Sequence, residues 1–389
     1  MVRTSQMKLH GTNADGLSAQ CDRPLASFDL TDRQARFLVT VMRHAGVFVG
    51  RQYAAFAGIT HGQKVHDFSQ ALLVRRFATS IELGTTGRTR IIHVHYKPLY
   101  AAIGEPDNRN RRHVTIDRTI HRLMILDAVL ADRSINWLGS EREKRRYFEE
   151  RLGDNLRDNE YPRLVFGKPP NVTIRYFPDK LPIGYEPDRR RHVFLYLARS
   201  ASPMDFRVFI LRHLDLLNAL GFWTIRVLFP KSMGHASAAY SDAAHELLAT
   251  PLTLSQRDEL EWFFQQPDAP AGDTSAAELS RWRATRRAFR SARFAALRRY
   301  WIAEGSRSIY LATSPISRDA MALGRGRVEC LTMPHDYAHF LALGRRGIRR
   351  MGKTRGDEAR GSSVPPPVQV KRTQSERSSL MLLTEAKPR

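Results

Sequence analysis

The stretch from residue 176 to 199, YFPDKLPIGYEPDRRRHVFLYLAR, has the outline of a metal-dependent nuclease centre. Such a centre ends one strand in an acid and carries an acid and a lysine two residues apart on the next strand. A divalent metal then stabilises charge on the phosphoryl oxygens, and the lysine activates water. Asp179 suits the first position, but the matching positions on the next strand fall near Tyr196 and Ala198, which cannot serve. The sequence therefore predicts a nuclease-like core without an intact hydrolytic centre.

An active centre would need other acids in place of the missing one. Glu186 lies in the expected turn before the second strand, and Asp205 lies on the following helix. These two acids and Asp179 would then have to surround Mg²⁺. Otherwise Asp179 is expected to cap the turn around Pro182 and Gly184. We expect no catalytic residue, no metal ligand and no cofactor, with Mg²⁺ held by the three acids as the alternative.

Other chemistries have less support in the sequence. Cys21 and Cys330 are the only cysteines, too few for a disulfide framework or a cysteine-ligated zinc site. The chain contains no GxxxxGK[ST] phosphate loop and no GxGxxG after a strand. His93 and His95 alternate on one expected strand as two potential metal ligands without a third. Nucleotide hydrolysis, dinucleotide binding and zinc chemistry are therefore not indicated.

The composition points to a polyanionic partner. The chain has 62 Lys and Arg against 39 Asp and Glu, a formal net charge of +23, and cationic side chains bind phosphate backbones largely through counterion release. Ribosomal contact or membrane-surface binding would need a similar charge, and nucleic acid is the preferred interpretation. The N-terminus lacks the apolar core of a signal peptide, and no stretch approaches the roughly 18 apolar residues of a membrane span. We expect a cytoplasmic protein with no membrane partner.

Residues 29–104 have the pattern of a winged helix-turn-helix. Thr31 can cap a helix that ends before Gly46, a short helix follows over residues 50–58, and a third begins near residue 62. A hairpin comes next, and in this arrangement the third helix enters the major groove while the hairpin contacts the adjacent backbone. The alternative is a three-helix cap with a solvated charged face. The residues expected to contact DNA in this unit are His61, Gln63, Lys64, His66, Arg75, Arg76, Arg88 and Arg90.

The sequence pattern of the second half of the chain predicts an α/β core. Strands are expected over residues 172–177, 192–198 and 222–230, and a helix capped by Ser202 joins the last two, which implies that they pair in parallel. Short strands over residues 307–313 and 328–334 would complete the sheet.

A basic helical region lies between these strands, over residues 236–301. Aromatic side chains such as Trp282 stand among many arginines there. Aromatic rings combined with guanidinium groups suit single strands or a duplex backbone, whereas the alternative is a helix packed by its aromatics with the arginines in water. The arginines expected to bind nucleic acid are Arg286, Arg287 and Arg290.

The order of these elements resembles the replication-relaxation family of bacterial plasmids and integrative elements. The resemblance rests on the winged helix, on a helical connector that contains Trp137, and on an α/β unit around Pro178 and Asp179, and it covers roughly residues 30–230. It implies DNA handling for a mobile element and a degenerate restriction-endonuclease-like domain of the PD-(D/E)XK type.

We therefore expect an α+β multidomain protein with a winged helix-turn-helix before a nuclease-like α/β core. The expected segments are a flexible arm (1–28), the winged helix-turn-helix (29–104), a helical connector (105–160), the nuclease-like domain with its basic helical insertion (161–345) and a disordered basic tail (346–389). The expected function is that of a DNA-binding accessory or regulatory protein of a mobile element, without catalysis. A metal-dependent nicking or relaxation endonuclease and an RNA-associated structural protein are the alternatives. Double-stranded DNA is the expected partner, with single-stranded DNA, RNA and proteins of the same element as further candidates.

Overall fold

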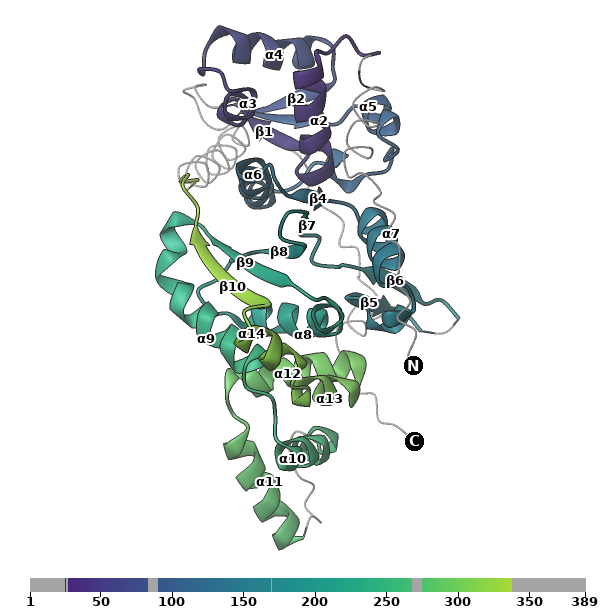
Figure 1. Cartoon of the computed structure of the whole chain (residues 1–389), viewed down its shortest axis with the longest axis vertical. Helices are drawn as coiled ribbons and strands as arrows, with labels where there is room; N and C mark the ends of the chain where they lie inside the picture. Colours follow the sequence, from purple (N-terminus) through teal and green to yellow (C-terminus); the bar gives the residue numbers. More distant parts are fainter. Residues whose placement is uncertain (1–24, 26, 83–89, 169, 268–274, 338–389) are drawn as a thin grey trace, which may run out of the picture. The chain divides into compact units, whose positions relative to one another are not determined.

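The computed structural model describes residues 25, 27–82, 90–168, 170–267 and 275–337 (Figure 1). The predicted tail and nearly all of the predicted N-terminal arm lie outside these residues, as does the tip of the predicted hairpin. The described residues belong to one compact unit, and the fold is α+β with a mixed central sheet. No helix in these ranges is both long enough and apolar enough to cross a membrane.

Residues 32–82 and 90–94 build three helices and a small antiparallel sheet. The helices are α2 (Asp32–His44), α3 (Gly50–Ala57) and α4 (Gln63–Val74), and the strands are β1 (Val47–Val49), β2 (Ala78–Glu82) and β3 (Arg90–Val94). β3 pairs with both other strands, so the strand order is β1-β3-β2. The sequence predicted the helices and the β2–β3 hairpin but gave no indication of β1.

Local sequence explains where α2 begins and how it packs. The Thr31 hydroxyl accepts a hydrogen bond from the Gln34 N–H, and the Gln34 side chain accepts one from the Thr31 N–H, which is a capping box. Phe37 on the inner face is fully buried, with its ring centroid 5.1 Å from those of both Phe48 and Tyr53. This aromatic cluster fixes α2 against β1 and α3.

Gly46 joins α2 to β1 in a conformation that favours glycine. Its φ is +70°, and a Cβ at this position would lie 2.3 Å from the backbone oxygen of Asn110. The Asn110 side-chain amide donates to the carbonyls of Met42 and Arg43, both at 3.0 Å, near the end of α2. Any side chain at residue 46 therefore disturbs the cap of α2.

We expect Gly46→Ala to lower the free energy of unfolding by about 2 kcal/mol, from left-handed strain and displacement of Asn110. Urea unfolding measures this loss. Gly221→Ala is the matched control, because a Cβ there would meet nothing within 4 Å, and its effect should stay within about 0.5 kcal/mol. Equal losses in the two variants would contradict the assignment.

A helical segment connects these elements to the central sheet. It comprises α5 (Lys97–Ala102), η1 (Arg109–Arg111), α6 (Ile116–Ala131), α7 (Glu141–Leu152), η2 (Gly153–Asn155) and η3 (Asp158–Glu160). Thr115 precedes the long helix α6, and Ser140 caps α7 through a capping box with Glu143.

The central sheet has the strand order β10-β9-β8-β7-β4. Its strands are β4 (Asn136–Leu138), β7 (Ile183–Glu186), β8 (Arg191–Leu197), β9 (Trp223–Phe229) and β10 (Gly326–Thr332). β8, β9 and β10 run parallel, whereas β7 runs antiparallel to both β8 and β4. The crossover between β8 and β9 is α8 (Met204–Ala219), as the predicted parallel pairing requires.

The strand predicted over residues 172–177 is present but lies in another sheet, and the strand predicted over residues 307–313 is wrong. The predicted strand over residues 172–177 forms β6 (Thr173–Tyr176), but β6 pairs with β5 (Arg163–Phe166) in a separate two-stranded sheet. β7, from residues expected to be a turn, takes its place beside β8. Residues 307–313 form a helix, α13 (Arg307–Thr313), because Ile309 and Ala312 face the core at helical spacing.

The predicted cap of α8 is also wrong. The helix begins at Met204, and the residue before it is Pro203, with no side-chain cap hydrogen bond. Ser202 instead belongs to the preceding turn, where its N–H donates to the Ser200 hydroxyl at 3.1 Å.

Side chains from β8 enter two cores, one on each face of the central sheet. Tyr196 packs into the core that includes α8, α9 (Ser237–Leu248) and α12 (Ala292–Glu304), whereas Leu195 and Leu197 join the core of α6 and the N-terminal elements. This two-sided burial explains why β8 reads as a continuous apolar run. The remaining described elements are η4 (Lys231–Ala236), α10 (Leu254–Gln265), α11 (Ala276–Ala288) and α14 (Ile316–Ala322).

Candidate nucleic-acid interface

The helix α4 and its two ends carry most of the residues predicted to contact DNA. Six of them lie there: His61, Gln63, Lys64, His66, Arg75 and Arg76. All except Arg75, which is half-buried, are exposed. Arg90 is exposed at the start of β3, and Arg88 lies outside the described residues.

Contacts within this surface distinguish its members. The Gln63 side-chain amide donates to the Asp67 carboxylate at 2.6 Å, so an acid shares the face. The Arg75 guanidinium lies 4.7 Å from the centroid of the Phe77 ring. In the ranges that the structure describes, no hydrogen bond or ion pair engages the side chains of Lys64 and Arg76. These two cations are therefore the best placed to meet phosphates.

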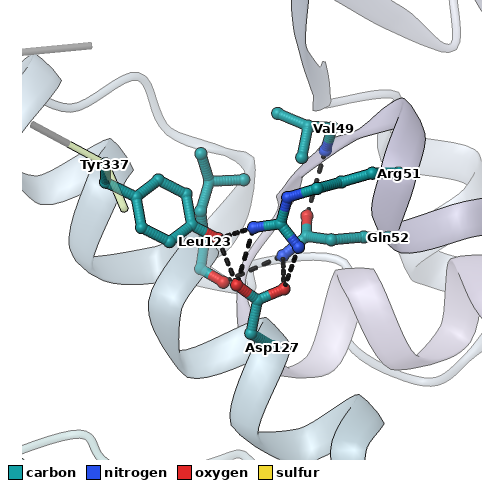
Figure 2. Close-up of polar contacts among 6 residues, drawn as sticks. All are labelled: Val49, Arg51, Gln52, Leu123, Asp127 and Tyr337. Atoms are coloured by element: carbon teal, nitrogen blue, oxygen red, sulfur yellow. Dashed lines mark hydrogen bonds and ion pairs between the residues drawn. The ribbon is translucent and has the colours of Figure 1, made fainter. Parts of the chain in front are cut away.

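A partly buried polar network holds α3, the helix before α4, against α6 (Figure 2). The Arg51 guanidinium donates two hydrogen bonds to the Asp127 carboxylate, at 2.9 and 2.8 Å. The Gln52 side-chain amide donates to Asp127 at 2.8 Å and to the Leu123 carbonyl at 2.9 Å. The Tyr337 hydroxyl contacts both Arg51 and Asp127. Residues far apart in the sequence thus meet at one carboxylate.

Asp127 is the centre of this network. Its side chain is only 9% exposed, and burial together with the Asp127 carboxylate raises the pKa of Tyr337. Because a short turn joins α3 to α4, the network fixes the position of the candidate DNA-contacting helix. Sequence analysis missed it, although Asp127 stands inside the apolar stretch LMILDAVL. An acid in such a stretch is a signal, because a buried acid needs a partner.

Asp179 pairs with an arginine. Nη1 of Arg212, on α8, lies 2.9 and 3.0 Å from the two carboxylate oxygens of Asp179. The backbone on either side is unusual, because Phe177 and Lys180 have φ values of 47° and 61°. A cavity of about 10 Å³ lies beside Asp179 and His213, with room for roughly one water molecule.

Two buried bases lie close to Asp179. Lys144, on α7, is 1% exposed, and its Nζ donates to the Leu181 carbonyl at 2.6 Å. Burial, helped by the charge of Arg109, lowers the pKa of Lys144 to about 7. Burial also lowers the pKa of His213 to about 4, although Asp179 acts in the opposite direction. The Arg212 guanidinium is the cation that pairs with Asp179.

The two other acids that would hold Mg²⁺ in the alternative prediction, Glu186 and Asp205, do not share the contacts of Asp179. Glu186 ends β7 and pairs with Arg189 at 3.3 Å, and Asp205 is exposed in the first turn of α8. The described ranges contain no group of three or more His, Cys, Asp or Glu side chains placed to bind a metal ion. Because Arg212 already binds both oxygens of Asp179, these residues do not fit Mg²⁺.

The positions expected to carry the missing acid and lysine are both buried. Tyr196 and Ala198 are 5% and 0% exposed, in the core beneath α8. A charged side chain at either position would need a partner in that core.

The arginines predicted to bind nucleic acid in the basic region lie on α11 and just after it. Arg286, Arg287 and Arg290 are all exposed. The Arg286 guanidinium lies 4.9 Å from the centroid of a Trp282 ring. The aromatic and cationic groups noted in the sequence are thus neighbours in space.

His93 has a structural role. Its Nε2 lies 3.1 Å from the Asn110 carbonyl oxygen, and burial lowers its pKa to about 4. Its ring centroid lies 6.0 Å from that of His95 and 4.4 Å from that of His113. The imidazole of His93 is therefore neutral near pH 7 and helps to join the Asn110 segment to β3.

Comparison with known protein families, with curated proteins and with solved structures finds no match to this chain. The resemblance to the replication-relaxation family stays an expectation from the sequence pattern. What the chain does must be inferred from its own residues.

Proposed function

We propose that this chain is a DNA-binding accessory or regulatory protein of a bacterial mobile genetic element. It binds duplex DNA through a winged helix made of α2, α3, α4 and the three short strands. The observation that carries this proposal is α4, a helix with a polar, cationic exposed face that follows α3 after a short turn and precedes the β2–β3 hairpin. In a winged helix, such a helix lies in the major groove and the hairpin lies along the backbone.

The charges around α4 support binding to phosphates. Lys64 and Arg76 are exposed near opposite ends of the helix, and the chain as a whole carries a formal charge of +23. The Gln63 amide suits an adenine edge, but it must first leave Asp67. Phosphate contacts therefore dominate the affinity, and base reading by Gln63 adds less.

The proposed function includes no hydrolysis. The support is the Arg212 guanidinium, which binds the carboxylate that a metal would need. A plasmid-nicking assay with Mg²⁺ or Mn²⁺ tests this, with the wild-type chain and Asp179→Ala expected to leave the plasmid equally intact. Nicking by the wild-type chain that Asp179→Ala abolishes would establish the endonuclease alternative.

The mobile-element role rests on the resemblance stated for residues 30–230. Genes for an integrase, a relaxase or a replication initiator beside this one would support it. Tighter binding to structured RNA than to duplex DNA at physiological salt would instead favour the RNA-associated alternative.

The double variant Lys64→Gln, Arg76→Gln should weaken duplex binding by about tenfold at physiological salt, because two phosphate contacts are lost. The slope of log K against log salt should flatten by about 1.8, or 0.9 for each contact. Fluorescence anisotropy of a labelled duplex with the full chain measures both quantities.

The control variant is Arg189→Gln, Arg190→Gln, which removes the same charge from two exposed arginines in the turn between β7 and β8. It should leave both affinity and salt slope near those of the wild-type chain. If the two double variants lose affinity equally, binding reflects overall charge and the assignment to α4 is wrong.

A further inference from the structure

A cavity opens among α10, α11 and α12, apart from the candidate winged helix. Its volume is about 170 Å³, and it is lined by Phe263, Gln266, Pro267, Trp282, Arg286 and Arg298. The α10 and α11 helices (Figure 1) are held together by Glu259, whose carboxylate accepts hydrogen bonds from Arg281 at 3.1 and 2.8 Å and from Thr285 at 2.6 Å. Glu259 therefore links two of the three helices that line the cavity.

Aromatic faces and cations meet in this cavity. The ring centroids of Phe263 and Trp282 lie 6.4 Å apart, and the Arg286 guanidinium lies 4.9 Å from a Trp282 ring centroid. Arg298, on α12, adds a second guanidinium to the lining. A planar ligand with a neighbouring negative charge suits such walls, because rings stack on its faces and guanidinium groups pair with its anion.

We propose that this cavity binds an unpaired nucleotide of single-stranded DNA. The base stacks against Trp282, and the Arg286 guanidinium meets an adjoining phosphate. A base inside a duplex is already stacked on both faces and cannot enter. This site goes beyond the duplex site proposed for α4 and does not depend on it.

The test uses the full chain and a labelled oligothymidylate of about 20 nucleotides, followed by fluorescence anisotropy. Trp282→Ala should weaken binding by about tenfold or more, because stacking on one aromatic ring carries much of the affinity for a base. Trp282→Phe keeps an aromatic face and should recover most of the affinity, which a merely structural loss would not allow. Arg286→Gln should weaken binding several-fold and flatten the salt slope by about 0.7.

The control is Arg283→Gln, which removes the same charge from an exposed residue of α11 that does not line the cavity. Equal losses in Arg283→Gln and Arg286→Gln would overturn the proposal, as would wild-type affinity in Trp282→Ala. Competition by free thymidine monophosphate as strong as by the oligonucleotide would also overturn it, in favour of a free-nucleotide site. Tighter binding of oligouridylate than of oligothymidylate would show that the ligand of the cavity is RNA and not DNA.

These experiments test the proposed cavity site and the proposed α4 site independently of each other. Duplex affinity should be unchanged in Trp282→Ala, and oligothymidylate affinity should be unchanged in Lys64→Gln, Arg76→Gln. Loss of both activities in either variant would mean that one surface serves both ligands, which contradicts the proposal of a separate site.

Discussion

Replacing Asp127 with alanine should lower the free energy of unfolding by about 3 kcal/mol, because the change leaves a partly buried guanidinium without its counter-ion. Arg51, Gln52 and Tyr337 all lose their shared acceptor. The Arg51 side chain is 33% exposed, so water can hydrate part of its charge and the loss stays near the lower end of the range for buried pairs. Urea unfolding followed by circular dichroism measures the change.

Two further variants separate the network from other effects at this helix. Asp117→Ala removes an exposed acid from the first turn of α6 and should cost less than about 1 kcal/mol. Adding Arg51→Met to Asp127→Ala should recover at least half of the loss, because no uncompensated charge then remains. If Asp127→Ala costs no more than Asp117→Ala, the network does not hold α3 against α6.

The elements that the sequence predicted correctly are those whose signals are local. The predicted cap of Thr31 is present, and the capping box that it forms with Gln34 involves residues only three apart. The helical spacing of Val65, Phe68 and Leu72 likewise matches the buried face of α4. Such contacts form within one or two turns of a helix, so a short window of sequence contains all of their information.

The elements predicted wrongly depend on partners elsewhere in the chain. β6 has the residues of a strand, but only its pairing with β5 shows that it lies outside the central sheet. β7 has four residues and contains Gly184, which gives almost no strand signal. A Cβ at Gly184 would come within 2.2 Å of the Ile135 side chain, so its absence lets β7 lie under that residue. Local propensity cannot report such a contact.

The candidate site likewise contains local features that the sequence predicted and long-range contacts that it did not. The exposed face of α4 follows from helical periodicity, and the sequence predicted most of it. The pairing of Asp179 with Arg212 joins residues on different elements, and the meeting of Arg51 with Tyr337 spans 286 residues. The sequence showed only that a second acid was missing beside Asp179. The structure shows that the Arg212 guanidinium binds the Asp179 carboxylate, where an active centre would hold a metal ion.

Lys144→Met should raise the free energy of unfolding at pH 7 by about 1–4 kcal/mol, because an apolar side chain of similar size removes the cost of burying an amine. Lys144 is 1% exposed, and burial lowers its pKa from 10.5 to about 7. This value already includes the neighbouring charges, of which Arg109 lowers the pKa and Glu143, Asp179 and Glu141 raise it. The hydrogen bond from Nζ to the Leu181 carbonyl is lost in the variant and offsets part of the gain.

The pH dependence tests this assignment more sharply than the gain at one pH. Between pH 7 and about 10 the amine is charged in the unfolded chain and mostly neutral in the folded one, so the unfolded state binds more protons and wild-type stability rises with pH. The rise attributable to Lys144 is about 1.4 kcal/mol per pH unit at most. The excess of the free energy of unfolding of Lys144→Met over that of the wild-type chain should therefore shrink steadily from pH 7 towards pH 10. All other titrating groups are the same in the two proteins, so their effects cancel in this difference.

The control is Lys97→Met, the same change at an exposed lysine. Its free energy of unfolding should differ from that of the wild-type chain by a constant amount over this pH range. If the Lys144→Met difference is equally constant, Lys144 keeps its charge when folded, and the neighbouring carboxylates outweigh its burial.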